Sequence, residues 1–313
     1  MIYTLTLNPA LDYILKVDSL DIGQTNRSDY EIINAGGKGI NVSKIFKNLS
    51  EDSIALGFVA GFSGDELLKI LEKEEINSDF IRLDSGFTRI NVKIKSDKET
   101  EINGKGPNID KKKQKDLFSK LEKLEDNDYL FLSGNLPSSL GSDFYRKIIL
   151  SLKDKNINII VDATGDALKE TLDLSPFLIK PNLRELEELF HITIENKEDI
   201  RNYARKLQDM NARNIIVSLG KDGAYLLSEN KEEMFLSAPK GEVVNSVGAG
   251  DSMVAGFVYA KKNGKSDEEA FRFSLACGSA TAFSSDIAKK EEIFDIYKKI
   301  DQLSNVKKKI NNN

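Results

Sequence analysis

The sequence predicts an α/β fold in which a mainly parallel central sheet is accompanied by a second, smaller sheet. Short apolar runs alternate along the chain with amphipathic runs of helical period, which is typical of βαβ units. Residues 54–60 and 157–161 are largely apolar on both faces, as expected for strands covered by helices on both sides. Residues 12–33 and 88–103 instead contain strand-like runs without an intervening helix, and we assign them to the second sheet.

Six apolar runs are predicted to be strands of the central sheet: residues 2–7, 53–60, 128–133, 157–163, 177–180 and 214–219. Helical periodicity is found in six runs: residues 38–49, 64–74, 111–124, 142–154, 183–190 and 198–210. The second sheet is predicted to have four strands, which carry the sequences YILKV, YEIIN, TRINVKIK and ETEIN.

The strand TRINVKIK alternates with period two. Its polar residues Arg89, Asn91 and Lys93 share one face, whereas the aliphatic residues from Ile90 to Ile94 share the other. We call the second sheet the lid, because its polar face can roof a binding site. Its apolar face needs cover, and we expect a homodimer in which the two lids pack together.

These patterns divide the chain into three parts. Residues 1–11, 34–87 and 104–305 are predicted to form the α/β core, and residues 12–33 and 88–103 the lid. The sequence NVKKKINNN ends the chain, and we expect residues 306–313 to be a disordered tail.

Composition excludes several classes of protein. The 313 residues carry a formal net charge of −5 without a basic stripe, which argues against a nucleic-acid-binding protein. The single cysteine, Cys277, excludes an intrachain disulfide. The chain has neither a signal-peptide pattern at its start nor an apolar run of about 18 residues, so we expect a cytoplasmic protein.

The stretch NSVGAGDSMVAGF (residues 245–257) places one carboxylate behind a loop with almost no side chains. If a helix starts near residue 250, the backbone N–H groups of this loop form an anion hole at its positive end. Asp251 would repel a bound phosphate, yet it is well placed to take a proton from a hydroxyl that attacks that phosphate. Alternatively, Asp251 only offsets the helix dipole.

Two further motifs lie near the N-terminus. In AGGKGIN (residues 35–41) the glycines permit close approach of a ligand to the backbone, and Lys38 supplies charge. Alternatively, the glycines only form a tight strand-to-helix turn. In NPALD (residues 8–12), Asp12 is a candidate for binding sugar hydroxyls or is a simple turn residue.

Two motifs in the second half of the chain also have two interpretations. KPNLRE (residues 180–185) places Asn182 and Glu185 three residues apart at a helix start, which suits hydrated Mg²⁺ but equally a capping box. SLGKDG (residues 218–223) follows a strand and either contacts a nucleotide or is a plain hairpin turn.

The order of these motifs resembles that of the ribokinase-like carbohydrate kinases of the PfkB family, over roughly residues 1–300. GAGD is the most specific mark of the family and GGKG is the second. The SGNLP motif (residues 133–137) departs from the family pattern at Asn135, where serine is common in relatives. Since Ser133 and Gly134 are retained, we expect little consequence.

The resemblance implies an α/β sandwich with a small β-sheet lid, and transfer of a phosphoryl group from ATP, with Mg²⁺, to a sugar hydroxyl. Asp251 would be the general base, and the amides of Gly248, Ala249 and Gly250 would stabilise the charge on the transferring phosphoryl group.

The resemblance also implies the residues around both substrates. Those expected to bind the sugar phosphate are Asp12, Gly37, Lys38, Gly39, Asn41, Arg89, Asn103 and Ser133. Within this set, Lys38 and Arg89 would hold the phosphate that the substrate already carries. Those expected to lie along ATP are Lys180, Asn182, Ser218, Leu219, Gly220, Lys221, Asp222, Gly223 and Gly250, and Asn182 with Glu185 would act on Mg²⁺ through water.

Within the family, TRINVKI and ETEINGKGP resemble the branch that phosphorylates fructose 1-phosphate at its 6-hydroxyl. Kinases of tagatose 6-phosphate share GGKG and ETEI but usually lack INVK and EING. A kinase of tagatose 6-phosphate or fructose 6-phosphate is therefore the alternative. A catalytically silent sugar-phosphate sensor is a remoter one, because a sensor has no need of Asp251.

Overall fold

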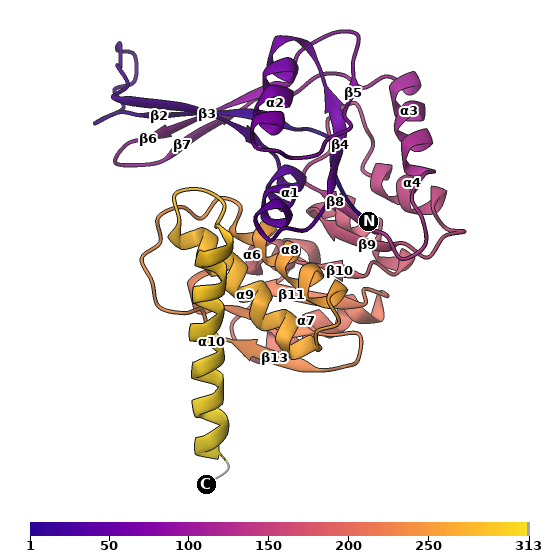
Figure 1. Ribbon diagram of the computed structural model, residues 1–313, viewed down its shortest axis with the longest axis vertical. Coiled ribbons are helices and arrows are strands. Elements are labelled where there is room, and N and C mark those ends of the chain that lie inside the picture. The colour runs from indigo at the N-terminus through magenta and orange to yellow at the C-terminus, as the bar shows by residue number, and fades with distance from the viewer. Residues whose placement is uncertain (312–313) are drawn as a thin grey trace.

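The computed structural model describes residues 1–311, and within them the strands form two separate sheets (Figure 1). The larger sheet runs in the order β13 (Glu233–Leu236), β12 (Ala224–Leu227), β11 (Asn214–Ser218), β10 (Leu178–Ile179), β9 (Asn158–Asp162), β8 (Tyr129–Ser133), β1 (Ile2–Thr6), β4 (Ile54–Val59) and β5 (Ile81–Arg82). Its neighbouring strands are parallel except for the antiparallel pairs β11–β12 and β12–β13.

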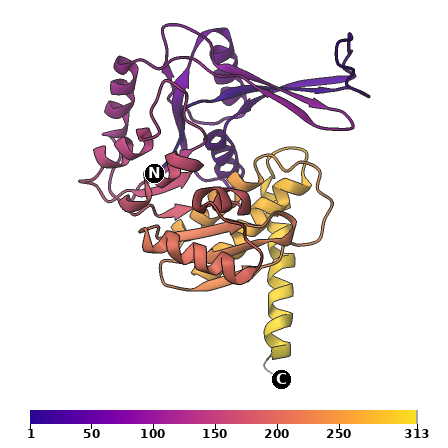
Figure 2. The same ribbon diagram turned by 180° about the vertical axis from the view of Figure 1, so that it is seen from behind.

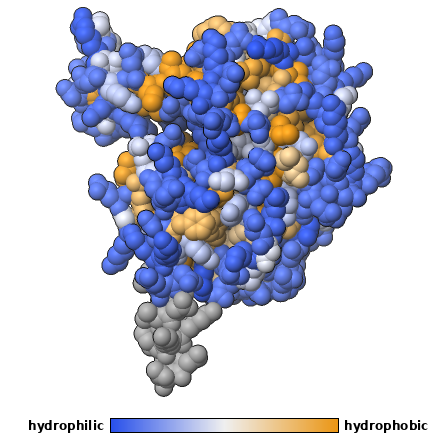
Figure 3. Space-filling model, in the orientation of Figure 1, coloured by the Kyte–Doolittle hydropathy of each residue, from blue (hydrophilic) through white to orange (hydrophobic). Residues whose placement is uncertain are grey.

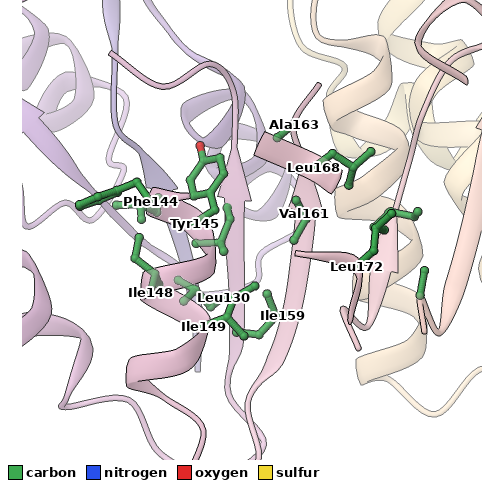
Figure 4. Packing of buried hydrophobic residues seen from close by; sticks show 14 of the residues in the cluster. Leu130, Phe144, Tyr145, Ile148, Ile149, Ile159, Val161, Ala163, Leu168 and Leu172 are labelled. Atoms are coloured by element: carbon green, nitrogen blue, oxygen red, sulfur yellow. The ribbon is translucent and has the colours of Figure 1, made fainter. Parts of the chain in front are cut away.

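Helices cover both faces of the larger sheet. One hydrophobic core involves α3 (Lys111–Leu121), α4 (Phe144–Ser151), α5 (Gly165–Lys169), α6 (Leu183–Phe190) and α7 (Lys197–Asp209), with the short 3₁₀ turn Leu172–Leu174. The other core involves α1 (Lys38–Asn48), α8 (Ala249–Lys262), α9 (Asp267–Phe283) and α10 (Lys290–Asn311). Alternation along β8 divides its side chains between them, because Leu130 and Leu132 belong to the first core and Phe131 to the second. Figure 4 shows the first core where α4 packs on β8 and β9.

The α/β prediction is confirmed, and each of the six predicted core strands and six predicted helices is present. The elements not predicted are β5, β12, β13, α5, α9 and α10. Helix α9 is buried almost all round over residues 270–281, so it lacks the one-sided apolar stripe by which a surface helix is recognised in a sequence.

The C-terminal segment differs from the expectation. Helix α10 continues through residues 306–311, which corrects the prediction of a disordered tail for these residues. Lysine has a good helix propensity and no glycine or proline interrupts the segment, so a charge-rich sequence is compatible with a helix here. Residues 312–313 lie outside the described residues.

The smaller sheet is the predicted lid and has four strands in the order β3 (Tyr30–Gly36), β2 (Ala10–Lys16), β6 (Arg89–Lys95) and β7 (Thr100–Asn103). It projects from the core beside α2 (Gly61–Lys73), as Figures 1 and 2 show from opposite sides. Strands β2 and β6 are parallel, and the outer pairs are antiparallel.

The register of the lid confirms its two predicted faces. Asp12 lies opposite both Asn34 and Asn91, whereas Tyr13 lies opposite Ile33 and Val92. Asn91 and Lys93 are buried on the polar face, and Ile33 on the other face is 47% exposed. In Figure 3, hydrophobic residues gather where the lid meets the body of the protein.

Among the described residues, none of the helices is long and apolar enough to cross a bilayer.

Candidate active site

A pocket of about 410 Å³ lies at the carboxyl ends of the parallel strands β1, β8, β9 and β10, and we call it the central pocket. This edge is where ligands bind in open α/β sheets, because strand ends and helix starts converge there. Twelve of the residues expected to form the site line this pocket: Asp12, Gly37, Lys38, Asn41, Arg89, Ser133, Lys180, Asn182, Glu185, Gly248, Gly250 and Asp251.

Helix α8 starts at the centre of the pocket. Its N-cap is Gly248, which has a positive φ of 79°, and a Cβ atom at this position would lie 2.5 Å from Cδ1 of Ile287. The backbone conformation therefore favours glycine here. The first turn of a helix leaves backbone N–H groups without a partner inside the helix, and of these the amide of Ala249 donates to the backbone oxygen of Ser246 at 3.3 Å. Lys180 places its ammonium beside Gly250 in the same turn. This end of α8 is suited to bind an anion.

Asp251 lies in that first turn and is buried, with 6% of its surface exposed. Its Oδ2 accepts a hydrogen bond of 2.8 Å from Nδ2 of Asn41 on α1. The GGKGIN and GAGD motifs, which are far apart in the sequence, therefore meet through this hydrogen bond. It fixes the rotamer of the only acidic side chain that the first turn of α8 contributes.

A second buried carboxylate stands next to Asp251. Asp162 ends strand β9, and its Oδ1 lies 3.3 Å from Nζ of Lys38 and 3.7 Å from Nζ of Lys180. Its Oδ2 is buried, and within the described part of the chain it has no hydrogen-bond partner. One carboxylate thus holds two ammonium groups, one within the GGKG motif and one beside the start of α8.

The two neighbouring carboxyl groups differ in their affinity for protons. Burial, and then the negative charge of Asp162, raises the pKa of Asp251 to about 6, against the opposing effect of Lys38. Burial would also raise the pKa of Asp162, but the charges of Lys180 and Lys38 hold it below its ordinary value. The site therefore contains one carboxylate that stays ionised and one that accepts a proton near neutral pH.

The lid closes the pocket on its other side. Arg89 donates from Nε to the backbone oxygen of Asn8 at 3.0 Å, which points its guanidinium toward the strand ends. Asp12 accepts from Nδ2 of Asn91 at 2.8 Å and forms an ion pair of 3.1 Å with Nζ of Lys93. Of the three lid residues expected near substrate, Asp12 and Arg89 line the central pocket, whereas Asn103 does not.

Both interpretations of KPNLRE describe the same two residues. Asn182 Oδ1 accepts from the amide of Glu185 at 2.8 Å, and Glu185 Oε2 accepts from the amide of Asn182 at 2.8 Å, so the pair is a capping box for α6. Both also line the central pocket. An oxygen that accepts one hydrogen bond can accept another, so these side chains are compatible with hydrated Mg²⁺. The described part of the chain contains no cluster of three metal-ligating His, Cys, Asp or Glu residues.

A second pocket of about 510 Å³ adjoins the central one, and the two share Gly250. Ser218, Gly220, Lys221 and Gly223 form one wall of it, and Ala249 at the start of α8 also lines it. The SLGKDG segment is both a hairpin turn between β11 and β12 and a wall of this pocket, so its two interpretations are compatible. The remaining wall is mainly apolar and includes Phe283.

Four expected residues line neither pocket. Gly39 is buried in α1, where a Cβ atom would lie 2.5 Å from Oγ1 of Thr6. Asn103 is exposed on β7 opposite Asn91. Leu219 and Asp222 lie within the turn after β11, and their backbones hydrogen-bond inside that turn.

Several residues of the site were missed in the sequence. The central pocket also contains Thr6, Asn8, Lys93 and Asn135, and Asp162 is buried against its lysines. Asp162 had a detectable signal, because it is a carboxylate that ends a buried parallel strand. The far wall of the second pocket, residues 238–241, carries no motif and was not predictable.

Comparison with known proteins agrees with this geometry. The family model described as "pfkB family carbohydrate kinase" matches residues 6–292. The chain is 44% identical to the 1-phosphofructokinase of Bacillus subtilis, covering 93% of this chain and 95% of that protein. It is 34% identical to a tagatose-6-phosphate kinase of Staphylococcus epidermidis, covering 96% and 99%. A crystal structure of a phosphofructokinase from Staphylococcus aureus superposes with a TM-score of 0.84 at 41% identity, covering 95% and 97%. The chain belongs to the pfkB family of carbohydrate kinases.

Proposed function

We propose that this kinase transfers the γ-phosphoryl group of ATP to the 6-hydroxyl of fructose 1-phosphate and releases fructose 1,6-bisphosphate. The observation that carries the proposal is a buried aspartate at the start of α8, which lines the central pocket directly after Gly250, the residue that the two pockets share. The identity to a 1-phosphofructokinase and the lid sequence TRINVKI support the choice of sugar. We assign the reaction to the cytoplasm.

Asp251 is the general base of the proposed reaction. Its carboxylate, oriented by Asn41, takes the proton of the 6-hydroxyl as the oxygen of that hydroxyl bonds to the γ-phosphorus and the bond to the β-phosphate oxygen breaks. The amides at Gly248 and Gly250, with the ammonium of Lys180 beside Gly250, stabilise the charge on the transferring group. A contribution from Ala249 requires its amide to leave the backbone oxygen of Ser246. Lys38 and Lys180 keep their positions because Asp162 binds both.

The second pocket takes ATP in this proposal. Its mainly apolar wall suits a purine base, and residues 218–223 lie along the nucleotide. The phosphates extend toward Gly250, the residue that both pockets share. Mg²⁺, held through water by Asn182 and Glu185, would neutralise charge on the phosphates.

The central pocket takes the sugar phosphate. Lys38 and Arg89 hold its 1-phosphate, because both line this pocket and a guanidinium together with an ammonium suits a dianion. Asp12 and Asn41 bind ring hydroxyls. This orientation directs the 6-hydroxyl toward Asp251.

We expect fructose 1-phosphate to be the preferred acceptor. A coupled assay with fructose 1-phosphate, fructose 6-phosphate and tagatose 6-phosphate should give a kcat/KM at least about 100-fold higher for the first, about 2.7 kcal/mol of transition-state preference. Preference for tagatose 6-phosphate would instead assign the chain the activity named for its relative from Staphylococcus epidermidis, a tagatose-6-phosphate kinase. Absence of turnover with every ketose phosphate would favour a sensor.

Asp251→Asn should abolish turnover while both substrates still bind. Asparagine preserves the size of the side chain and can still accept from Asn41, but it cannot take a proton. We expect kcat to fall by about 10²–10⁴-fold, with dissociation constants for ATP and sugar phosphate, measured by calorimetry, largely unchanged. A folded variant that kept more than about a tenth of the wild-type kcat would refute the assignment of the base.

The pH profile should report the raised pKa of Asp251. The base acts when deprotonated, so kcat/KM should be flat at neutral pH and decline by about tenfold per unit below about pH 6. The substrate phosphate itself ionises near this pH. Asp162→Asn separates the two effects, because loss of the Asp162 charge should shift the inflection to lower pH only if it belongs to Asp251. An unmoved inflection would assign it to the substrate.

We further propose a homodimer in which the apolar faces of two lids cover each other. A groove of about 390 Å³ between the lid and α2 is lined by Leu11, Tyr13, Ile33, Ile90 and Phe62, together with Asp65, Glu66 and Lys69. Phe62 on α2 is 70% exposed, and Ile102 on the apolar face of the lid is 61% exposed. Burying each such side chain is worth about 1.5–3 kcal/mol, and a second copy would supply the cover.

Val92→Asp should weaken this dimer and raise the KM for the sugar, because it places a charge at the centre of the apolar face. Lys95→Met, on the polar face of the same strand, should leave assembly intact. Sedimentation velocity at micromolar concentration measures both. A monomeric wild type, or a Val92→Asp variant that stays fully dimeric, would refute lid-to-lid packing without affecting the kinase assignment.

A further inference from the structure

Three strands of the lid, together with Gly104 directly after the fourth, form the surroundings of one carboxylate. Asp12 lies on β2, and β6 supplies Asn91 and Lys93. Asn91 Oδ1 in turn accepts from the amide of Gly104, directly after β7, at 3.2 Å. From β3, Gly36 lies opposite Ala10 and faces the Asp12 side chain.

Gly36 is a glycine because of this side chain. Its φ is outside the left-handed region, so the backbone conformation does not call for glycine. A Cβ atom at this position would lie 2.5 Å from Oδ2 and 2.6 Å from Cγ of Asp12. An alanine could therefore adopt the backbone, but it would displace the carboxylate from its place.

The contacts orient the carboxylate on both of its oxygens. Oδ1 accepts from Asn91 at 2.8 Å, and Oδ2 pairs with Lys93 at 3.1 Å. Each oxygen retains a further lone pair, and Asp12 lines the central pocket. A planar group fixed in this way accepts hydrogen bonds from hydroxyls in one arrangement only. An epimer whose hydroxyl points elsewhere cannot reach the remaining lone pair of either oxygen, and such mismatches discriminate strongly.

We propose that Gly36, Asn91 and Lys93 are positioning residues that set the sugar stereoselectivity of the kinase by fixing the plane of the Asp12 carboxylate. This inference rests on the proposed function, in which Asp12 binds ring hydroxyls. Lys93 also pairs more distantly with Glu101, at 3.9 Å, and Asp12 is the closer of its two acidic partners. In this proposal the lid covers the site and also carries Asp12, the side chain that distinguishes one sugar epimer from another.

The test compares fructose 1-phosphate with its C4 epimer, tagatose 1-phosphate, in steady-state kinetics. In Gly36→Ala and in Lys93→Met, the ratio of kcat/KM between the two sugars should fall by about tenfold or more, with the KM for ATP unchanged. Lys95→Met removes a charge from the same face of β6 and should keep the wild-type ratio. A structural defect alone would reduce kcat for both sugars equally and leave the ratio intact.

A double-mutant cycle separates action through Asp12 from direct contact of Lys93 with substrate. If Lys93 acts through Asp12, Lys93→Met should have little further effect on the ratio in an Asp12→Asn background. Full additivity, or an unchanged ratio in both single variants, overturns the inference. If Gly36→Ala fails to fold, the Lys93 cycle decides alone.

The activity of the wild type with fructose 1-phosphate tests the proposed function separately from the role of the positioning residues. If the wild type does not phosphorylate fructose 1-phosphate, the same cycle is run with the ketose phosphate that it does use and the C4 epimer of that substrate. The ratio then tests the role of the three positioning residues independently of which sugar is natural.

Discussion

The ion pairs between Asp162 and the two lysines are the interaction on which the site depends. Lys38 starts α1 and Lys180 follows β10, so one carboxylate at the end of β9 connects elements on both sides of the pocket. Without it, the ammonium groups of half-buried Lys38 and buried Lys180 would repel each other beside the start of α8. With it, the same negative charge raises the proton affinity of Asp251. The positions of the two cations and the raised pKa of Asp251 therefore have a common origin.

The lid imposes a second constraint, because its two faces have different requirements. The polar face must place Asp12, Arg89 and Lys93 against the core with little freedom. The apolar face must be covered, although Ile33 and Ile102 on it are substantially exposed. Strict alternation along β2 and β6 satisfies both requirements with the same residues in the same register. A shift of one residue would exchange the two faces and remove Asp12 from the site.

Much of this arrangement was predictable from the sequence. The α/β alternation and the four lid strands follow from the hydrophobic period. The side chains singled out in GAGD, GGKG and NPALD, namely Asp251, Lys38 and Asp12, line one pocket. The contact between Asn41 and Asp251 was not predictable, since each motif is interpretable alone. Asp162 was overlooked, although a carboxylate at the end of a buried parallel strand is a detectable signal. Helix α9 and residues 238–241 were missed because burial on all sides and loop shape leave no periodic signal.

The separation in sequence between Asn41 and Asp251 has a consequence for biosynthesis. Their hydrogen bond spans 210 residues, and β1, the first strand made, lies in the middle of the sheet between β4 and β8. Contacts of such long range form late in folding, because the intervening chain must be closed into a loop first. A chain that ends before α8 contains all four strands of the lid but cannot form the hydrogen bond between Asn41 and Asp251. The GGKGIN and GAGD motifs can therefore meet only after most of the chain has been made.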